Sequence, residues 1–142
     1  MIRARHTGLN VTSLADSLKF YVETLGLEID KLYSEPPGPY IDTLTGITGT
    51  VQHWAKVRTH GGYLLELVQW VEPKLGDAPP PVYNGRGVNH LCFQVDNVDG
   101  YLARLSDRGY RCRPIQLDPP GKVKNFVTFG PDGEIVELVE VL

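Results

Sequence analysis

The chain has 142 residues, enough for one compact domain with a real core or for two very small ones. Apolar residues make up 42% and charged residues 22%, and the formal net charge of −3 gives no reason to expect a nucleic-acid or membrane partner. The two cysteines, Cys92 and Cys112, are too few for a disulfide framework. The N-terminus lacks the apolar segment of a secretory signal. These features predict a protein of the reducing cytoplasm.

The first half of the chain predicts a strand, a helix and three further strands. Ser13 stands at an N-cap position with Asp16 three residues on, and Gly26 has the place of a glycine that ends a helix. A segment rich in proline and glycine, residues 34–49, predicts a long excursion or flap between strands. The expected strands cover residues of about 4–11, 27–33, 51–58 and 63–71.

The second half repeats this order after a proline-rich linker at about 73–86. Asp96 and Asn97 cap the predicted helix, and Gly109 ends it. The expected strands cover residues of about 88–95, 110–117, 125–130 and 134–141. The chain is therefore predicted to be a single α+β domain (1–142) of two tandem β-α-β-β-β units, about 1–72 and 87–142. Their curved mixed sheets would enclose a cleft.

One short pattern occurs in both units. It reads Gly62-Tyr-Leu-Leu-Glu66-Leu-Val68 in the first and Gly133-Glu-Ile-Val-Glu137-Leu-Val139 in the second. Side chains of a strand alternate between its two faces, so each glutamate shares a face with aliphatic neighbours two residues away. A carboxylate in an apolar strand is costly to bury unless something pairs with it. The doubled glutamate therefore indicates a functional position.

A histidine occupies the first strand of each unit, on the face opposite the residues that pack the helix. His6, Glu66, His90 and Glu137 would then all line the helix-free side of the sheets, with Cys92 beside them. A single histidine or glutamate in a strand is more often structural, but two matched pairs in register favour a metal site. Two imidazoles and two carboxylates suit one divalent ion, namely Ni, Co, Mn, Fe or Zn.

The chain resembles the vicinal oxygen chelate superfamily, which includes glyoxalase I, methylmalonyl-CoA epimerase, extradiol dioxygenases and antibiotic-resistance proteins. The resemblance covers nearly the whole chain. It rests on His6 with Ser17-Leu-Lys-Phe-Tyr-Val-Glu-Thr-Leu-Gly-Leu27, on Tyr63-Leu-Leu-Glu66-Leu, on Asn89-His90-Leu-Cys-Phe-Gln-Val-Asp96, and on Gly130-Pro-Asp-Gly-Glu-Ile-Val-Glu137-Leu. Because one fold hosts several chemistries, the resemblance is more specific for the superfamily than for a reaction.

Members with a His, Glu, His, Glu set resemble glyoxalase I and the epimerases. The resemblance implies a divalent-metal-dependent isomerase that removes a proton next to a carbonyl and forms a metal-stabilised enolate. Glu137 is expected to be both ligand and catalytic base. Glu35, Asp42 and Glu66 are candidates for the second proton donor. The resemblance also implies a small-molecule substrate and a homodimer.

Four positions are predicted substrate contacts: Asn10, Trp70, Arg86 and Cys92. Asn10 stands where lactoylglutathione lyases carry an arginine that binds a glutathione carboxylate, and Trp70 stands where they carry an asparagine, whereas the expected arginine is present at Arg86. Asn10 cannot provide a bidentate carboxylate clamp. An epimerase is therefore preferred over a lactoylglutathione lyase. A protein that binds a small molecule without turnover is a further alternative.

Overall fold

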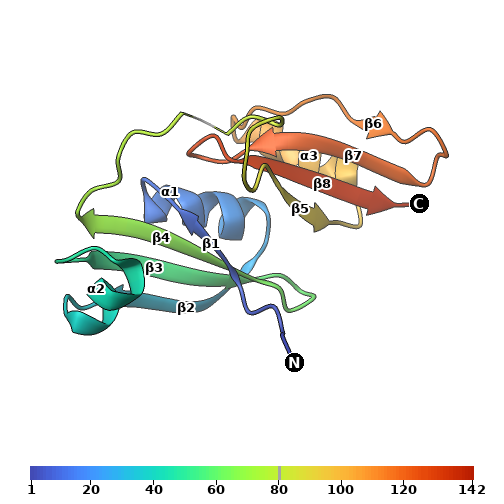
Figure 1. Cartoon of the computed structure of the whole chain (residues 1–142). Coiled ribbons are helices and arrows are strands. Elements are labelled where there is room, and N and C mark those ends of the chain that lie inside the picture. Colours follow the sequence, from blue (N-terminus) through green and yellow to red (C-terminus); the bar gives the residue numbers. More distant parts are fainter. Residues whose placement is uncertain (80) are drawn as a thin grey trace. The chain divides into compact units, whose positions relative to one another are not determined.

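The computed structural model describes residues 1–79 and 81–142, and the chain divides into two units, Met1–Asp77 and Ala78–Leu142 (Figure 1). The division falls in the stretch expected to be a linker, of which residue 80 lies outside the described residues. Each unit contains one four-stranded sheet with a helix against it. The predicted α+β class with two mixed sheets is confirmed.

The sheet of the first unit has the strand order β1-β4-β3-β2. Its strands are β1 (Thr7–Asn10), β2 (Glu28–Glu35), β3 (Val51–Arg58) and β4 (Leu64–Glu72). β1 runs parallel to β4, whereas the other pairs are antiparallel. The parallel pair sets Gly8 beside Glu66, so the residues that precede β1 approach the middle of β4.

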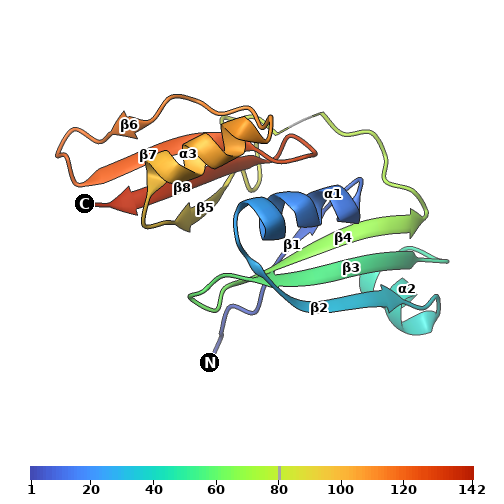
Figure 2. The same cartoon turned by 180° about the vertical axis from the view of Figure 1, so that it is seen from behind.

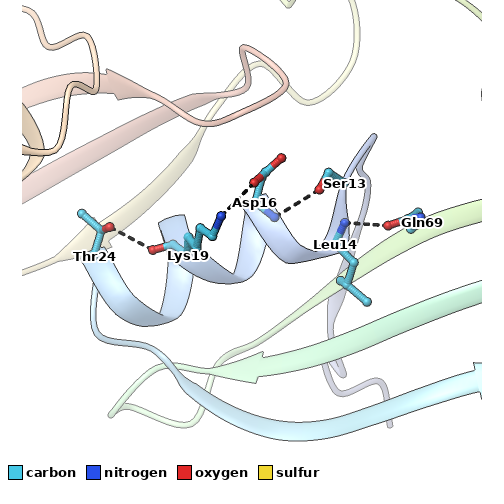
Figure 3. A network of polar contacts seen from close by, with 6 residues as sticks. All are labelled: Ser13, Leu14, Asp16, Lys19, Thr24 and Gln69. Carbon is cyan, nitrogen blue, oxygen red and sulfur yellow. Dashed lines mark hydrogen bonds and ion pairs between the residues drawn. The ribbon is translucent and has the colours of Figure 1, made fainter.

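The first helix is anchored to this sheet through its N-terminus. α1 (Leu14–Leu18) continues as a π-helix, η1 (Lys19–Thr24). The Ser13 hydroxyl accepts a hydrogen bond from the Asp16 amide at 3.2 Å, which is the predicted N-cap, and Gln69 of β4 accepts one from the Leu14 amide at 2.7 Å (Figure 3). The sequence predicted the cap but not the bond to β4.

The core of the first unit lies between this helix and one face of the sheet. Leu65 and Leu67 of β4 are fully buried, as are Phe20 and Tyr21 of the helix. Side chains alternate along β4, so Glu66 points to the opposite face. The predicted division into a helix-packing face and a helix-free face is therefore found in this sheet.

The segment predicted as a flap contains a short helix, α2 (Pro39–Thr45). The predicted excursion between strands is present, but the sequence did not indicate the helix within it. The Asp42 carboxylate accepts hydrogen bonds from the Gly49 and Thr50 amides at 3.0 and 2.9 Å. This side chain closes the connection from α2 to β3, a contact that hydrophobic periodicity does not indicate.

The second unit has the strand order β5-β8-β7-β6. Its strands are β5 (Leu91–Gln94), β6 (Gln116–Leu117), β7 (Val123–Phe129) and β8 (Ile135–Val141). β5 is parallel to β8, as β1 is to β4. The helix α3 (Val98–Asp107) lies against β7 and β8 (Figure 2). Asn97 caps it by accepting from the Gly100 amide at 2.9 Å, as predicted.

Three predicted strands are shorter in the structure. The segment 110–117 contributes only β6 and an isolated bridge from Cys112 to Thr128. Pro114 has no amide hydrogen and interrupts a regular ladder here. β1 and β5 begin at Thr7 and Leu91, so the two histidines stand immediately before their strands rather than within them.

The turn between β7 and β8 has no room for a side chain at its first residue. The Gly133 amide donates to the Gly130 carbonyl at 3.0 Å, and the buried Glu134 carboxylate accepts from the Asp132 amide at 3.0 Å. A Cβ atom at position 130 would collide with this carboxylate. Beyond this turn, β8 is held in register by β7, with Glu137 opposite Val127.

Among the described helices, none combines the length and the apolar character needed to cross a membrane.

Candidate functional site

The first predicted pair forms in the first unit. His6 Nε2 lies 3.2 Å from Glu66 Oε2, and the two side chains are 31% and 18% exposed. The pair is thus half-buried but open to a ligand. We call His6 and Glu66 the first half-site.

A lysine occupies the other oxygen of Glu66. Lys56 stands opposite Glu66 in the β3–β4 register, and its Nζ lies 3.2 Å from Glu66 Oε1. The same ammonium lies 4.7 Å from the centre of the Trp54 ring, a cation–π contact. The charge of Glu66 is therefore shared between an imidazole and an ammonium.

The second predicted pair forms in the same way in the second unit. His90 Nε2 lies 3.4 Å from Glu137 Oε2, and the side chains are 32% and 21% exposed. The other oxygen, Oε1, accepts a hydrogen bond of 2.6 Å from the Asn125 amide. We call His90 and Glu137 the second half-site. Its glutamate has a neutral amide where Glu66 has a cation.

The residue before His90 fixes the tautomer of its ring. Asn89 donates from Nδ2 to the Tyr83 carbonyl at 2.9 Å, which leaves its oxygen, Oδ1, 2.6 Å from His90 Nδ1. An amide oxygen only accepts hydrogen bonds, so Nδ1 carries the hydrogen. In the neutral ring the lone pair then lies on Nε2, facing the Glu137 carboxylate. Two acceptors 3.4 Å apart call for a proton or a cation between them.

The thiol of Cys92 lies beside Glu137, as the parallel register of β5 and β8 requires. Burial, and then the negative charge and hydrogen bonding of Glu137, raise the pKa of this thiol to about 11. Burial first, and then the charge of Glu137, also raise the pKa of Tyr83. Both groups are neutral near pH 7, so they add no negative charge to the second half-site.

The remaining predicted contacts are distributed unequally. Asn10 and Trp70, the two departures from the lactoylglutathione lyase pattern, contact each other: Trp70 Nε1 donates to Asn10 Oδ1 at 2.9 Å. Arg86 is exposed, and no hydrogen bond or ion pair of its side chain is found within the described part of the chain. The structure therefore brings Cys92 to a half-site, links Asn10 to Trp70, and leaves Arg86 apart from the described contacts.

The donor atoms of each pair suit a common ion. Two ligands with bonds of 2.0–2.2 Å at right-angled or tetrahedral positions are separated by about 3–3.5 Å. The measured separations of 3.2 and 3.4 Å match this spacing. Across residues 1–79 and 81–142, no three His, Cys, Asp or Glu side chains form a metal-binding group. Each half-site therefore offers two such donors among the described residues.

Sequence reasoning missed the side chains that surround these donors. Lys56 and Asn125 lie on strands adjacent to the two glutamates, and Asn89 and Tyr83 precede His90. The alternation along β3 did place Lys56 on one face, but pairing with Glu66 depends on the register between strands. No local signal in the sequence gives that register.

Comparison with known proteins defines the family. The family model of the Glyoxalase/Bleomycin resistance protein/Dioxygenase superfamily matches residues 3–138. The chain belongs to this superfamily, as its resemblance predicted. Members of the superfamily include metal-dependent glyoxalases, epimerases and fosfomycin-resistance proteins.

Three similar proteins illustrate the range of the family. A lactoylglutathione lyase of Schizosaccharomyces pombe is 33% identical over 148 residues, which cover 96% of this chain and 47% of that protein. A glyoxalase family protein from Bacillus cereus has the same fold, with a TM-score of 0.91, 22% identity, and coverage of 100% and 95% of the two chains. A fosfomycin-resistance protein from Listeria monocytogenes, solved with Mn(II) and sulfate, has a TM-score of 0.69 at 16% identity, with coverage of 100% and 95%.

Proposed function

We propose that this protein is a divalent-metal-dependent isomerase or epimerase of a small carbonyl compound, with His6, Glu66, His90 and Glu137 as the metal ligands. The observation that carries the proposal is the pairing of one histidine nitrogen with one glutamate oxygen in each unit, at 3.2 and 3.4 Å. The Mn(II) bound by the Listeria relative supports a divalent ion. Such an ion would supply Lewis-acid polarisation of a substrate carbonyl.

Glu137 is the base in this proposal. It accepts the proton from the carbon next to the carbonyl. The C–H electron pair then moves into the adjacent C–C bond, and the carbonyl oxygen takes up the negative charge of an enolate. Asn125 holds Oε1 of the carboxylate at 2.6 Å and so orients it. Neither lysine nor arginine forms an ion pair with Glu137 among the described residues, so no such cation competes with the proton.

Epimerisation needs a second group that returns a proton to the opposite face of the carbon. Of the three candidates, Asp42 already accepts the Gly49 and Thr50 amides and thereby closes a loop. Glu66 and Glu35 remain. If Glu66 has this role, the Lys56 ammonium, whose Nζ lies 3.2 Å from Glu66 Oε1, is the neighbouring source of its proton.

A second candidate function is that of a lactoylglutathione lyase. It is favoured by the 33% identity to the fission-yeast enzyme. The hydrogen bond between Asn10 and Trp70 argues against it, because neither side chain offers the charged clamp that a glutathione carboxylate requires. A third candidate function is the binding of a small molecule in the same place without turnover.

Metal analysis followed by isotope exchange tests the proposal. We expect purified protein, reconstituted with Mn, Co, Ni, Fe or Zn, to bind one ion per chain and to lose it in His6→Ala and in Glu137→Ala. Candidate carbonyl compounds are then incubated in D₂O, and deuterium is measured at the carbon next to the carbonyl. Mass measurement in solution determines whether the protein is a homodimer.

The controls separate the three functions. Exchange without glutathione supports the isomerase, whereas exchange that depends on a glutathione adduct supports the lyase. Binding of a compound without any deuterium exchange supports a protein that binds a small molecule without turnover. His60→Ala, which alters a histidine outside both half-sites, serves as the matched control and should retain the metal. Absence of metal binding by the unaltered protein would overturn the metal site.

A further inference from the structure

A small cavity lies in the second unit, on the face of the sheet that carries Glu137. It has a volume of about 290 Å³, room for about ten water molecules at 30 Å³ each. Phe129 and Ile135, two of its lining residues, stand opposite each other in β7 and β8. Val127 and Glu137 form the facing pair two residues further along the same strands, so all four side chains share one face.

Two arginines line the cavity on one side. The Arg111 guanidinium lies 3.8 Å from the centre of the Phe129 ring, and that of Arg113 lies 5.7 Å from the same ring. Arg113 also lies 5.6 Å from the ring of Tyr83. Stacking on aromatic faces leaves the N–H edges of both guanidiniums free to donate. In the described chain, neither arginine forms an ion pair with a carboxylate.

The cavity thus combines two positive charges with an apolar floor, and its described lining residues include no acidic one. Its lining residues are Pro81, Val82, Tyr83, Arg111, Arg113, Phe129, Gly133 and Ile135. Like charges placed side by side repel, and an anion between them relieves the repulsion. Arginine recognises carboxylates and phosphates through paired hydrogen bonds, which a solvated lysine does less well.

One wall of the cavity is also a support of the second half-site. The ring of Tyr83 packs against the ring of His90, with centres 5.6 Å apart and an angle of 31° between the planes. Its backbone carbonyl accepts from Asn89, which orients His90. Ile135, which lines the cavity, precedes Glu137 by two residues in β8, or about 7 Å along the strand. A molecule held by the arginines over Tyr83 and Phe129 would reach Glu137 with a short chain.

We propose that this cavity binds the anionic group, a carboxylate or a phosphate, of the carbonyl compound that Glu137 deprotonates. The substrate class is then a carbonyl compound that carries a negative group a short chain away from the reacting carbon. This inference rests on the proposed function for the reaction, but the anion site can be measured without any turnover. Arg111 and Arg113 determine specificity and take no part in the proton transfer.

Anion binding is tested first, with the full chain at constant ionic strength. Succinate and inorganic phosphate are titrated separately against chloride, and the arginine Nε–H signals are followed by NMR. We expect saturable shifts of the Arg111 and Arg113 signals, with binding weakened at least tenfold in Arg113→Gln and in Arg111→Gln. The stronger of the two probes identifies the carboxylate or the phosphate as the preferred group.

Arg104→Gln is the matched control, because Arg104 also stacks on an aromatic ring, Tyr101 of α3, at 4.9 Å, but does not line the cavity. It should leave the titration unchanged. Equal binding by the double variant Arg111→Gln/Arg113→Gln and the unaltered protein would overturn the site. Failure of both anions to shift either arginine would do the same, and the guanidiniums would then be surface groups that only cover the rings. Circular dichroism checks that the variants fold.

Isotope exchange then connects the cavity to the reaction. A 2-oxo dicarboxylic acid is compared with its uncharged diester. We expect Arg113→Gln to raise KM at least tenfold for the acid and to change neither KM nor kcat appreciably for the ester. Equal effects on both compounds would contradict the substrate class. If the unaltered protein binds the anion but exchanges no carbonyl compound, the proposed function fails while the anion site stands.

Discussion

The two half-sites have the same donors in the same local geometry, yet their surroundings differ in charge. Glu66 contacts the Lys56 ammonium, whereas Glu137 contacts the Asn125 amide and the neutral thiol of Cys92. The difference follows from single positions in the repeat. Val127 stands opposite Glu137 where Lys56 stands opposite Glu66. Two copies of one histidine–glutamate arrangement can therefore have different roles when only the neighbouring side chains differ.

The Lys56 ammonium beside Glu66 stabilises the ionised carboxylate, which suits a metal ligand. Among the described residues, Glu137 has no lysine or arginine beside it as Glu66 has Lys56, which suits a group that accepts and releases a proton. The histidines differ as well. His90 is oriented by Asn89, while in the described part of the chain Glu66 is the side-chain partner found for His6. The following predictions test how far this division of roles extends.

The largest expected effect distinguishes the two glutamates. Glu137→Gln keeps the shape of the side chain but cannot accept a proton, so the rate of deuterium exchange should fall by about 10²–10⁴-fold. Glu66→Gln, assayed at saturating metal, should lose about tenfold at most, since Glu137 remains. Metal content is measured in both variants to separate loss of the ion from loss of the base. Equal losses at equal metal occupancy would contradict the assignment of roles.

A thiol reports the charge in each half-site. With the pKa of Cys92 raised from 9.0 to about 11, its thiolate fraction at pH 8 is about a hundredfold lower than that of an ordinary cysteine, and alkylation should be slower in proportion. The rate should rise about tenfold per pH unit and level off only above pH 11, whereas that of an ordinary cysteine levels off near pH 9. Gly8, which faces Glu66 as Cys92 faces Glu137, accepts a Cβ without a clash.

The thiol introduced by Gly8→Cys should therefore react faster than Cys92, because the Lys56 ammonium near Glu66 favours a thiolate. Iodoacetamide labelling of chelator-treated protein, followed by peptide mass spectrometry, measures both rates in one sample. In Glu137→Gln the labelling of Cys92 should accelerate. If both thiols reacted at the same rate, the two half-sites would not differ in local charge.

Orientation of His90 by Asn89 gives a medium-sized effect. Asn89→Ala removes the acceptor for Nδ1–H and should weaken metal binding about 10–100-fold, which is typical of the loss of a partner that orients a ligand. Isothermal titration with Mn(II) or Zn(II) measures the change. Asn84→Ala, an exposed asparagine of the same connecting segment, is the control. An unchanged affinity in Asn89→Ala would show that the ring needs no such support.

The smallest effect comes from exchanging the charge between the half-sites. Val127→Lys would place an ammonium opposite Glu137, and exchange at saturating metal should slow about tenfold because a cation then disfavours protonation of the base. Lys56→Val should tighten metal binding by about the same factor, since it removes a cation that repels the ion. Metal titration and deuterium exchange are measured for both variants. Faster exchange in Val127→Lys, or weaker metal binding in Lys56→Val, would contradict the electrostatic explanation.

The sequence predicted the two histidine–glutamate pairs because they depend on two properties that are local. Alternation along a strand assigns Glu66 and Glu137 to one face, and the repeat places a histidine at the matching point of each unit. Burial of Leu65 and Leu67 on the other face confirms that alternation in the first unit. Each histidine approaches its glutamate because the first strand of a unit is parallel to the last.

The surroundings of the donors could not be predicted in the same way. Lys56 and Asn125 reach the glutamates only through the register between neighbouring strands. Arg113 belongs to a segment predicted as a strand, which Pro114 and the short β6 make irregular. α2 was missed because the bonds accepted by Asp42 stabilise its connection to β3, and a capping carboxylate leaves no periodic signal.

The glycine at the start of the β7–β8 turn has an effect well beyond the turn. A side chain at Gly130 would displace the Glu134 carboxylate and break the hydrogen bond that it accepts from the Asp132 amide. A slip of one residue in the β7–β8 register would exchange the two faces of β8, placing Glu137 on the face that packs against α3 and Val136 on the opposite face. The turn that sets the register of β8 therefore also sets the face of the sheet on which Glu137 lies.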